Sequence, residues 1–196
     1  MLSSAERGYR MHMATKTHRW TRADLVRLPD DGNRYEVLDG ELFVTPQAAF
    51  RHQRIAFELA VALRQYCNDH DIGEIVGPGA VVWDENELQP DVEVIPGRHE
   101  SLADTKWKEL PLPLLVVEVL SESTRQRDFG KKRAAYARLG IHAYWIVDPD
   151  NRRVIVWSPR SAEPEIVTDI LQWRPRYELP PFEIPLSSFF PATPTA

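Results

Sequence analysis

Residues 114–120 form an apolar run, LLVVEVL, with the length of a buried strand and a single carboxylate, Glu118, inside it. An acid in a buried strand costs several kcal/mol unless a cation, a metal ion or hydrogen bonds compensate its charge. A second strand pattern, over residues 90–95, begins with Asp91 directly after a proline. A basic segment with helical spacing, which carries Lys132, follows the strand over residues 114–120. Two strands that each bring a carboxylate, followed by a lysine on a helix, indicate a divalent-metal site suited to phosphodiester chemistry.

The length of 196 residues favours a single domain with a hydrophobic core of its own. We expect this domain to span residues 20–196, after a flexible extension over residues 1–19 in which Met11 and Met13 are candidate alternative starts. The single cysteine, Cys67, excludes an internal disulfide and a cysteine-based zinc site, and it favours a reducing, cytoplasmic environment. Because no apolar segment approaches membrane-spanning length, we expect no membrane partner.

The charge distribution is uneven along the chain. The net charge of −5 argues weakly against a general affinity for nucleic acids, because phosphate binding needs clustered cations. Residues 122–138 differ from the rest, since six Lys and Arg stand there against two acids, a local charge of +4. The cations that we expect to contact nucleic acid are Arg125, Arg127, Lys131 and Arg133.

The pattern of apolar residues and turn residues predicts a mixed α/β (α+β) fold with a central sheet. A short helix after Thr21 and a hairpin over 35–44, with Asp39-Gly40 at its tip, come first. We then expect a helix over 52–70, strands over 74–83 and 90–95 joined by a turn at 84–87, a loop over 97–110, a strand over 114–120, a helix over 129–139, and strands over 143–148 and 153–157. From about residue 174 the chain is rich in proline but dotted with aromatic residues, which is typical of an extended strap packed on the domain.

These segments, taken in order, resemble a known family. The segments that carry the resemblance are YEVLDGEL, a helix that opens at His52, PDVEVI, LLVVEVLS, the spacing Asp128-xxx-Lys132-xxx-Tyr136, and AYWIVDP. They are similar to the Uma2 family of the PD-(D/E)XK restriction-endonuclease-like superfamily over about residues 20–190. The resemblance implies a restriction-endonuclease-like core, with a central mixed sheet flanked by helices, and a Mg²⁺-dependent nuclease site. Carried over position by position, it assigns catalysis to Glu36, Asp91, Glu118 and Lys132.

The position of the lysine departs from the pattern of the wider superfamily. That pattern places a lysine two residues after the second acid, but this chain has Leu120 there. In the Uma2 pattern the lysine lies on the following helix, where this chain has Lys132. The chemistry then needs Mg²⁺ or Mn²⁺ on hard oxygen ligands, for which Asp91, Glu118 and the backbone carbonyl of Val119 are the candidates. Lys132 would hold the attacking water or the phosphate.

Several residues have a structural alternative beside the functional one. Glu118 and Lys132 would form an ion pair without a catalytic role, and Glu36 would be an exposed cross-strand residue. Glu93 shares the face of Asp91 and is either an outer neighbour of the metal or a solvated strand residue. Asp128 and Tyr136 share a helix face with Lys132, as second-shell members of the site or as a structural ladder, and His52 either begins its helix or contacts a substrate phosphate. We expect no chemical role for His142, Asp148 and Asp150.

The combined prediction is a metal-dependent endonuclease that acts on DNA. The alternatives are a catalytically inactive binding or regulatory protein on the same scaffold, and a metal-dependent phosphohydrolase that acts on small molecules or RNA. Three acids and a lysine favour activity, whereas the acidic pI of about 5.7 weighs modestly against it. Since cutting both strands of a duplex usually takes two sites, a homodimer is also expected. The geometric prediction is that Glu36, Asp91, Glu118 and Lys132 converge in one solvent-accessible cleft.

Overall fold

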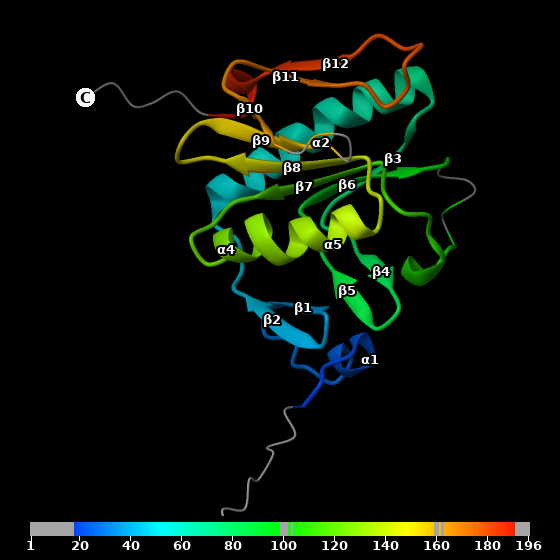
Figure 1. Ribbon diagram of the computed structural model, residues 1–196, viewed down its shortest axis with the longest axis vertical. Coiled ribbons are helices and arrows are strands. Elements are labelled where there is room, and N and C mark those ends of the chain that lie inside the picture. Colours follow the sequence, from blue (N-terminus) through cyan, green and yellow to red (C-terminus); the bar gives the residue numbers. More distant parts are fainter. Residues whose placement is uncertain (1–17, 99–101, 103, 159–160, 162, 191–196) are drawn as a thin grey trace, which may run out of the picture.

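The computed structural model describes residues 18–98, 102, 104–158, 161 and 163–190, so most of the expected extension lies outside the described residues (Figure 1). A six-stranded sheet in the order β10-β9-β8-β7-β6-β3 forms the centre. Only its β7–β8 pair is parallel, so the sheet is mixed as predicted. The strands of this central sheet are β3 (Gly73–Val76), β6 (Val92–Pro96), β7 (Leu115–Val119), β8 (Ala143–Asp148), β9 (Arg153–Trp157) and β10 (Glu165–Val167).

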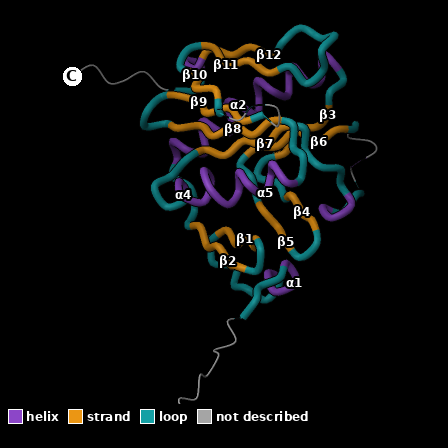
Figure 2. The backbone as a smooth tube through the Cα atoms, viewed as in Figure 1, coloured by secondary structure: helices purple, strands orange, loops and turns teal. Residues whose placement is uncertain are grey.

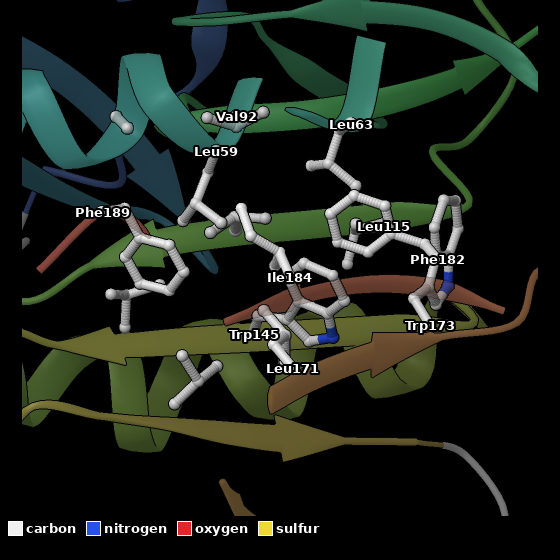
Figure 3. Packing of buried hydrophobic residues seen from close by; sticks show 14 of the residues in the cluster. Leu59, Leu63, Val92, Leu115, Trp145, Leu171, Trp173, Phe182, Ile184 and Phe189 are labelled. Carbon is white, nitrogen blue, oxygen red and sulfur yellow. The ribbon is translucent and has the colours of Figure 1, made fainter. Parts of the chain in front are cut away.

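Alternation along the strands sorts side chains to the two faces of this sheet. In β7, Leu115, Val117 and Val119 point to one face, and Val116 and Glu118 point to the other. The first face is covered by the long helix α2 (Phe50–His70) and by a hairpin of β11 (Ile170–Trp173) and β12 (Phe182–Pro185), which η3 (Leu186–Ser188) follows. Figure 3 shows the side chains from α2, the central sheet and this hairpin packed together in one core.

The opposite face of the central sheet carries a second layer. A helical segment built from α4 (Arg125–Arg127), η2 (Asp128–Lys132) and α5 (Arg133–Arg138) crosses it. Helices therefore lie on both sides of the sheet (Figure 2). Beside this segment lies a four-stranded sheet in the order β2-β1-β5-β4, with the short helix α1 (Arg22–Leu25) near it. The strands of this small sheet are β1 (Arg34–Leu38), β2 (Glu41–Thr45), β4 (Val81–Trp83) and β5 (Asn86–Leu88).

The structure corrects several predicted element boundaries. The single strand expected over 74–83 is wrong, because β3 and β4 belong to different sheets and a cis Gly77-Pro78 bond lies between them. Proline has no N–H for a ladder, so it breaks a strand that apolar content alone favours. The turn expected over 84–87 holds only at its first two residues, since β5 starts at Asn86. The helix expected over 129–139 begins four residues earlier, at Arg125, and η1 (Trp107–Glu109) interrupts the loop expected over 97–110.

The strap predicted from about residue 174 packs on the domain, where β12 pairs with β11, a strand that ends just before it. Trp173, Phe182 and Ile184 are buried against the core, whereas Tyr177 in the connecting loop is 91% exposed. Among the described residues, no helix combines the length and the apolar character that crossing a bilayer requires.

Candidate active site

Lys132 lies at the centre of a buried cluster of charged side chains between the two sheets and the helical segment. Its Nζ is 2.8 Å from Glu36 Oε1 and 2.7 Å from Glu118 Oε1. Lys132 and Glu36 are fully buried, and Glu118 is 2% exposed, so the alternative of an exposed Glu36 is wrong. The structure thus joins three of the predicted residues, from β1, β7 and η2. The ion pair between Glu118 and Lys132 is present, and it is compatible with both a catalytic and a structural role.

A π-helical turn positions the lysine. Residues 128–132 form this turn between α4 and α5, and such turns occur frequently at functional sites. Asp128 and Lys132 point into the protein, while the neighbouring Lys131 is exposed. The Lys132 ammonium is 4.0 Å from Asp128 Oδ1, and the Tyr136 hydroxyl donates to Glu118 Oε1 at 3.3 Å. The shared face predicted for Asp128, Lys132 and Tyr136 is therefore observed.

Asp91 lies directly before β6 and is held by three groups. Arg34 donates to its Oδ1 at 2.8 Å, and the backbone N–H of Val119 donates to its Oδ2, also at 2.8 Å. His52, the third residue of α2, places Nε2 3.0 Å from the same Oδ2. Burial opposes ionisation of this carboxyl, but His52, Arg34 and the Val119 N–H outweigh it and hold the pKa of Asp91 well below its usual range. Asp91 is therefore a fixed, ionised carboxylate.

Glu118 differs in its electrostatic environment. Burial raises the pKa of Glu118 to about 8. Lys132 lowers this pKa, but burial and the repulsion of the nearby acids together outweigh its effect. The opposite holds for Glu36, where burial is outweighed by Lys132 and Arg127, and the pKa of Glu36 is lowered. Burial likewise opposes the charge of Lys132, but its carboxylate neighbours raise its pKa, so Lys132 is an ammonium ion.

The cluster carries more carboxylates than cations. Its acids are Glu36, Asp91, Glu118 and Asp128, and its permanent cations are Arg34, Arg127 and Lys132. One negative charge is therefore in excess when these seven groups are ionised and His52, which contacts Asp91, is neutral. Burial, with the repulsion of the nearby acids, accounts for the raised pKa of Glu118, since a buried carboxylate without a full counter-charge retains a proton or requires a further cation.

Two adjoining clefts reach this cluster from the surface. A cleft of about 670 Å³ is lined by Arg34, His52 and residues around Thr45, Ser121 and Asp150. A smaller one of about 270 Å³ is lined by Arg34 and Asp91. Neither cleft is lined by Glu36, Glu118 or Lys132. The prediction of one solvent-accessible cleft for all four residues is therefore wrong in part, because Asp91 alone reaches a cleft and the other three lie beneath it.

Glu93 is buried on the same sheet face as Asp91, so the alternative of a solvated strand residue is wrong. Its side chain has no exposed surface, and neither carboxylate oxygen has a hydrogen bond of good geometry within the described structure. Burial raises the pKa of Glu93 to about 7, and the nearby backbone N–H of Ala80 offsets this only in part. The carboxylate packs against Gly79, where a Cβ atom would lie 1.8 Å from Oε1.

The basic segment over 122–138 presents fewer cations to solvent than its sequence suggests. The prediction that Arg127 contacts nucleic acid is wrong. Its side chain is only 9% exposed, lies 3.3 Å from Glu36 and donates to Thr45 at 2.8 Å. It belongs to the buried cluster rather than to a surface for phosphates. Arg125 remains 41% exposed while paired with Asp148. Lys131 is half-exposed and pairs with Glu41, and the Arg133 guanidinium lies 4.2 Å from the ring centroid of Trp157.

Sequence reasoning missed three contributors to the site. Arg34 holds Asp91 and lines both clefts, and the backbone N–H of Gln89 donates to Glu36 Oε1 at 2.8 Å. Thr45 anchors Arg127. Arg34 had a detectable signal, since it stands two positions before Glu36 and period 2 puts both on one face of β1. His142 lies at the opposite end of β8, and Asp148, the last residue of this strand, is buried and pairs with Arg125 and Arg153.

The donor set fits a hard divalent ion. Asp91 and Glu118 are neighbours in the antiparallel register, one position beyond the Val92–Val117 pair. Mg²⁺ usually takes one or two protein carboxylates and completes its shell with water and phosphate oxygens. Within the described residues no group of three or more His, Cys, Asp and Glu side chains is arranged to hold an ion, so an ion at this place would have two carboxylate ligands from the protein. Lys132 and Tyr136 both contact Oε1 of Glu118, and within the described part of the chain both Asp128 oxygens are buried without a hydrogen bond.

A mixed sheet with helices on both faces, in which two adjacent strands carry acids and one of these acids pairs with a buried lysine, defines a nuclease-like domain. The sequence matches the Uma2 family, described as "Putative restriction endonuclease", over residues 22–187, and the chain belongs to this family. Among solved structures it is similar to the crystal structure of a putative nuclease belonging to DUF820 from Anabaena variabilis, with a TM-score of 0.70 and 18% identity over 87% of this chain and 97% of that chain. That likeness shows the fold. No match to a curated protein was found. The predicted family and the nuclease-like fold are confirmed.

Proposed function

We propose that this chain is a metal-dependent endonuclease that hydrolyses phosphodiester bonds in DNA. The description of its family and of the similar structure supports a nuclease. The observation that carries the proposal is the cluster around Lys132, which holds one carboxylate in excess and reaches a cleft through Asp91, His52 and Arg34. A purely structural network gains nothing from excess buried charge, whereas a site that binds a cation requires it.

Asp91, Glu118 and the carbonyl of Val119 would hold Mg²⁺ or Mn²⁺. When bound, the ion supplies Lewis acidity, and it lowers the pKa of a water molecule. The residues of the chain do the rest. Arg34, at the border of both clefts, is placed to bind a substrate phosphate and to keep Asp91 oriented. Lys132, fixed between two carboxylates, stabilises charge at the attacking water or the phosphate, and Glu36 holds its ammonium in place.

One observation favours the inactive binding or regulatory protein as a second candidate. Lys132 has no exposed surface, and its carboxylate partners close over it. An active enzyme must open this contact to substrate or metal, whereas a scaffold protein keeps it closed. A metal-dependent phosphohydrolase that acts on small molecules or RNA would use the same residues and is distinguished by its substrate.

Cleavage of supercoiled plasmid with Mg²⁺ or Mn²⁺, and with EDTA as the control, tests the proposal. We expect metal-dependent nicking that Asp91→Asn and Lys132→Ala each reduce by at least tenfold. Lys108→Ala is the control, because it removes an exposed lysine in η1, outside the helical segment. Circular dichroism verifies that each variant is folded. Absence of cleavage of duplex DNA, single strands, RNA and an aryl phosphodiester would favour the scaffold candidate, and cleavage only of the last two would favour the phosphohydrolase.

We also propose a homodimer, since two sites are needed to cut a duplex on both strands. The exposed apolar side chains Phe50, Phe57 and Val61 follow one another along α2 at intervals of seven and four residues. A second copy of the same helix would cover them, with Arg54 and Glu58 as complementary charges on the same helix. Light scattering after size exclusion should give a dimer that Phe57→Glu converts to a monomer, and a monomeric wild type would contradict this.

A further inference from the structure

A second cavity lies at the end of the central sheet that is remote from the charged cluster. Its volume is about 680 Å³, similar to that of the cleft beside the cluster. It opens where β7 and β8 begin, with Leu114 and Ala143 in its wall, whereas Glu118 lies near the end of β7. At a rise of about 3.3 Å per residue, Leu114 and Glu118 are roughly 13 Å apart along the strand. The two sites are therefore separate.

Aromatic side chains form much of the wall of this cavity. Trp145 of β8 and Trp173 of β11 line it, with ring centroids 6.3 Å apart and planes at 84°. Figure 3 shows both side chains between the central sheet and the C-terminal hairpin. Tyr177 lies at the rim, on the loop that joins β11 and β12, with 91% of its surface exposed. The exposed ring of Tyr177 at this rim is a surface on which a planar ring can stack.

Two polar groups of this cavity would meet a ligand, the indole N–H of Trp145 and the guanidinium of Arg174. Trp145 is fully buried, and its indole N–H has no hydrogen-bond partner in the described structure. A buried donor without a partner requires a ligand or a water, and because an indole only donates, the ligand must offer an acceptor. Arg174 lines the cavity, and its Nη1 donates to the carbonyl oxygens of Tyr177 and Leu179 at 3.2 and 3.1 Å, which holds the guanidinium at the rim.

Arg174 is the permanent charge among the described residues of the lining, which include no Asp or Glu. This is unusual for a chain with a net charge of −5. A ligand that suits this cavity therefore carries a planar ring that stacks on Tyr177, an acceptor atom for the Trp145 N–H, and a negative group for Arg174.

We propose that this cavity binds a nucleotide, either free or as part of a single strand. A nucleobase supplies the planar ring and the acceptors, and its phosphate supplies the negative group beside Arg174. The volume of about 680 Å³ lies in the range of small-molecule sites and accommodates one nucleotide. The proposal does not rest on the nuclease activity proposed for the charged cluster, because none of the residues of that cluster lines this cavity.

Tryptophan fluorescence tests this directly, since Trp145 and Trp173 report on the cavity. In EDTA, AMP should quench the emission saturably, adenosine should bind at least tenfold more weakly, and ribose 5-phosphate should leave the emission unchanged. A short single-stranded oligodeoxynucleotide distinguishes the two sources. Binding at least tenfold tighter than that of AMP supports a strand, and equal or weaker binding supports a free nucleotide.

Variants decide whether the signal comes from this cavity. Tyr177→Ala should weaken AMP binding at least fivefold without affecting the fold, because the side chain is exposed. Arg174→Gln should abolish the preference for AMP over adenosine. The controls Trp107→Phe, which alters an exposed indole elsewhere, and Asp91→Asn, at the charged cluster, should bind AMP as the wild type does. Absence of saturable quenching, unchanged binding by Tyr177→Ala, or loss of binding in Asp91→Asn would each overturn the proposal.

Discussion

Replacing Glu118 by glutamine should stabilise the metal-free protein at neutral and alkaline pH. Glutamine keeps the shape of the side chain and an oxygen that can accept from Lys132, but it removes the charge in excess. The pKa of Glu118 is raised in the folded protein from 4.5 to about 8. Between these two values the folded state binds more protons than the unfolded state, so the free energy of unfolding falls as the pH rises.

The magnitude follows from the same shift. One pKa unit corresponds to about 1.4 kcal/mol, so ionised Glu118 costs at most about 5 kcal/mol above pH 8. Relaxation of the cluster reduces this value. For a chain of this length 1 kcal/mol moves the melting temperature by about 2–4 °C, so even half of the limit gives a shift of about 5–10 °C.

Calorimetry in EDTA between pH 5 and pH 8.5 measures the effect. The wild type should melt progressively lower as the pH rises, and Glu118→Gln should lose a large part of that slope. Part of the slope should remain, because burial also raises the pKa of Glu93, to about 7. Glu36→Gln is the matched control from the same cluster. The pKa of Glu36 is lowered, so its charge stabilises the fold above its ordinary pKa, and this variant should melt lower than the wild type at pH 7.

Metal adds a second measurement to the same experiment. An ion that binds only the folded state adds about 2.7 kcal/mol at a hundredfold excess over its Kd, so the wild type should melt higher in millimolar Mg²⁺ or Mn²⁺ than in EDTA. Glu118→Gln should lose this gain. Equal pH slopes in the wild type and Glu118→Gln would refute the assignment of the excess charge to Glu118. If the wild type and Glu118→Gln gain the same melting temperature in the presence of metal, the ion binds elsewhere.

Three further predictions concern the surroundings of this cluster. Lys132→Ala should lower the free energy of unfolding by about 3–5 kcal/mol, because two buried carboxylates lose their shared cation, while Lys131→Ala should stay within about 0.5 kcal/mol in denaturant titrations. Gly79→Ala should lower the melting temperature, since the new Cβ would meet Glu93 Oε1, and an unchanged value would show that this carboxylate can move aside. If DNA binds across the exposed face of the helical segment, Arg125→Ala and Lys131→Ala should each reduce the slope of log K against log salt by about 1, and an unchanged slope would place the DNA on another surface.

The central strands were predictable because burial and alternation leave a strong pattern in the sequence. The continuous apolar run of β7 predicted a strand buried on both faces, and its period of two placed Glu118 among Val116 and Leu120. The convergence of Glu118 with Lys132 and Glu36 needed the family resemblance as well. Spacing along one chain does not show which strand of a hairpin turns toward a distant helix.

The features that were not predictable depend on contacts between distant segments. A row of cations along a helix has the same sequence pattern whether solvent or another sheet covers it, so the burial of Arg127 against Glu36 and Thr45 left no local signal. The π-helical turn before Lys132 likewise has no periodicity that distinguishes it from an α-helix. The break between β3 and β4 had one local signal, Pro78, but the assignment of the two strands to different sheets is a property of the assembled fold.

The excess carboxylate is the feature that separates an enzyme from a scaffold on this fold. A protein that retained the fold only for binding would gain stability by replacing Glu118 with a neutral residue, because the cation count of the cluster would then match its acids. Under the proposed function the charge is kept because a cation binds there, and Asp91, which lines the smaller cleft, would be the point at which it enters. A Glu118→Gln variant that is more stable in EDTA, whose melting temperature does not respond to Mg²⁺ and that does not nick DNA, would show all three expected consequences of removing this charge. A variant that is more stable and still cleaves would separate stability from catalysis and remove Glu118 from the site.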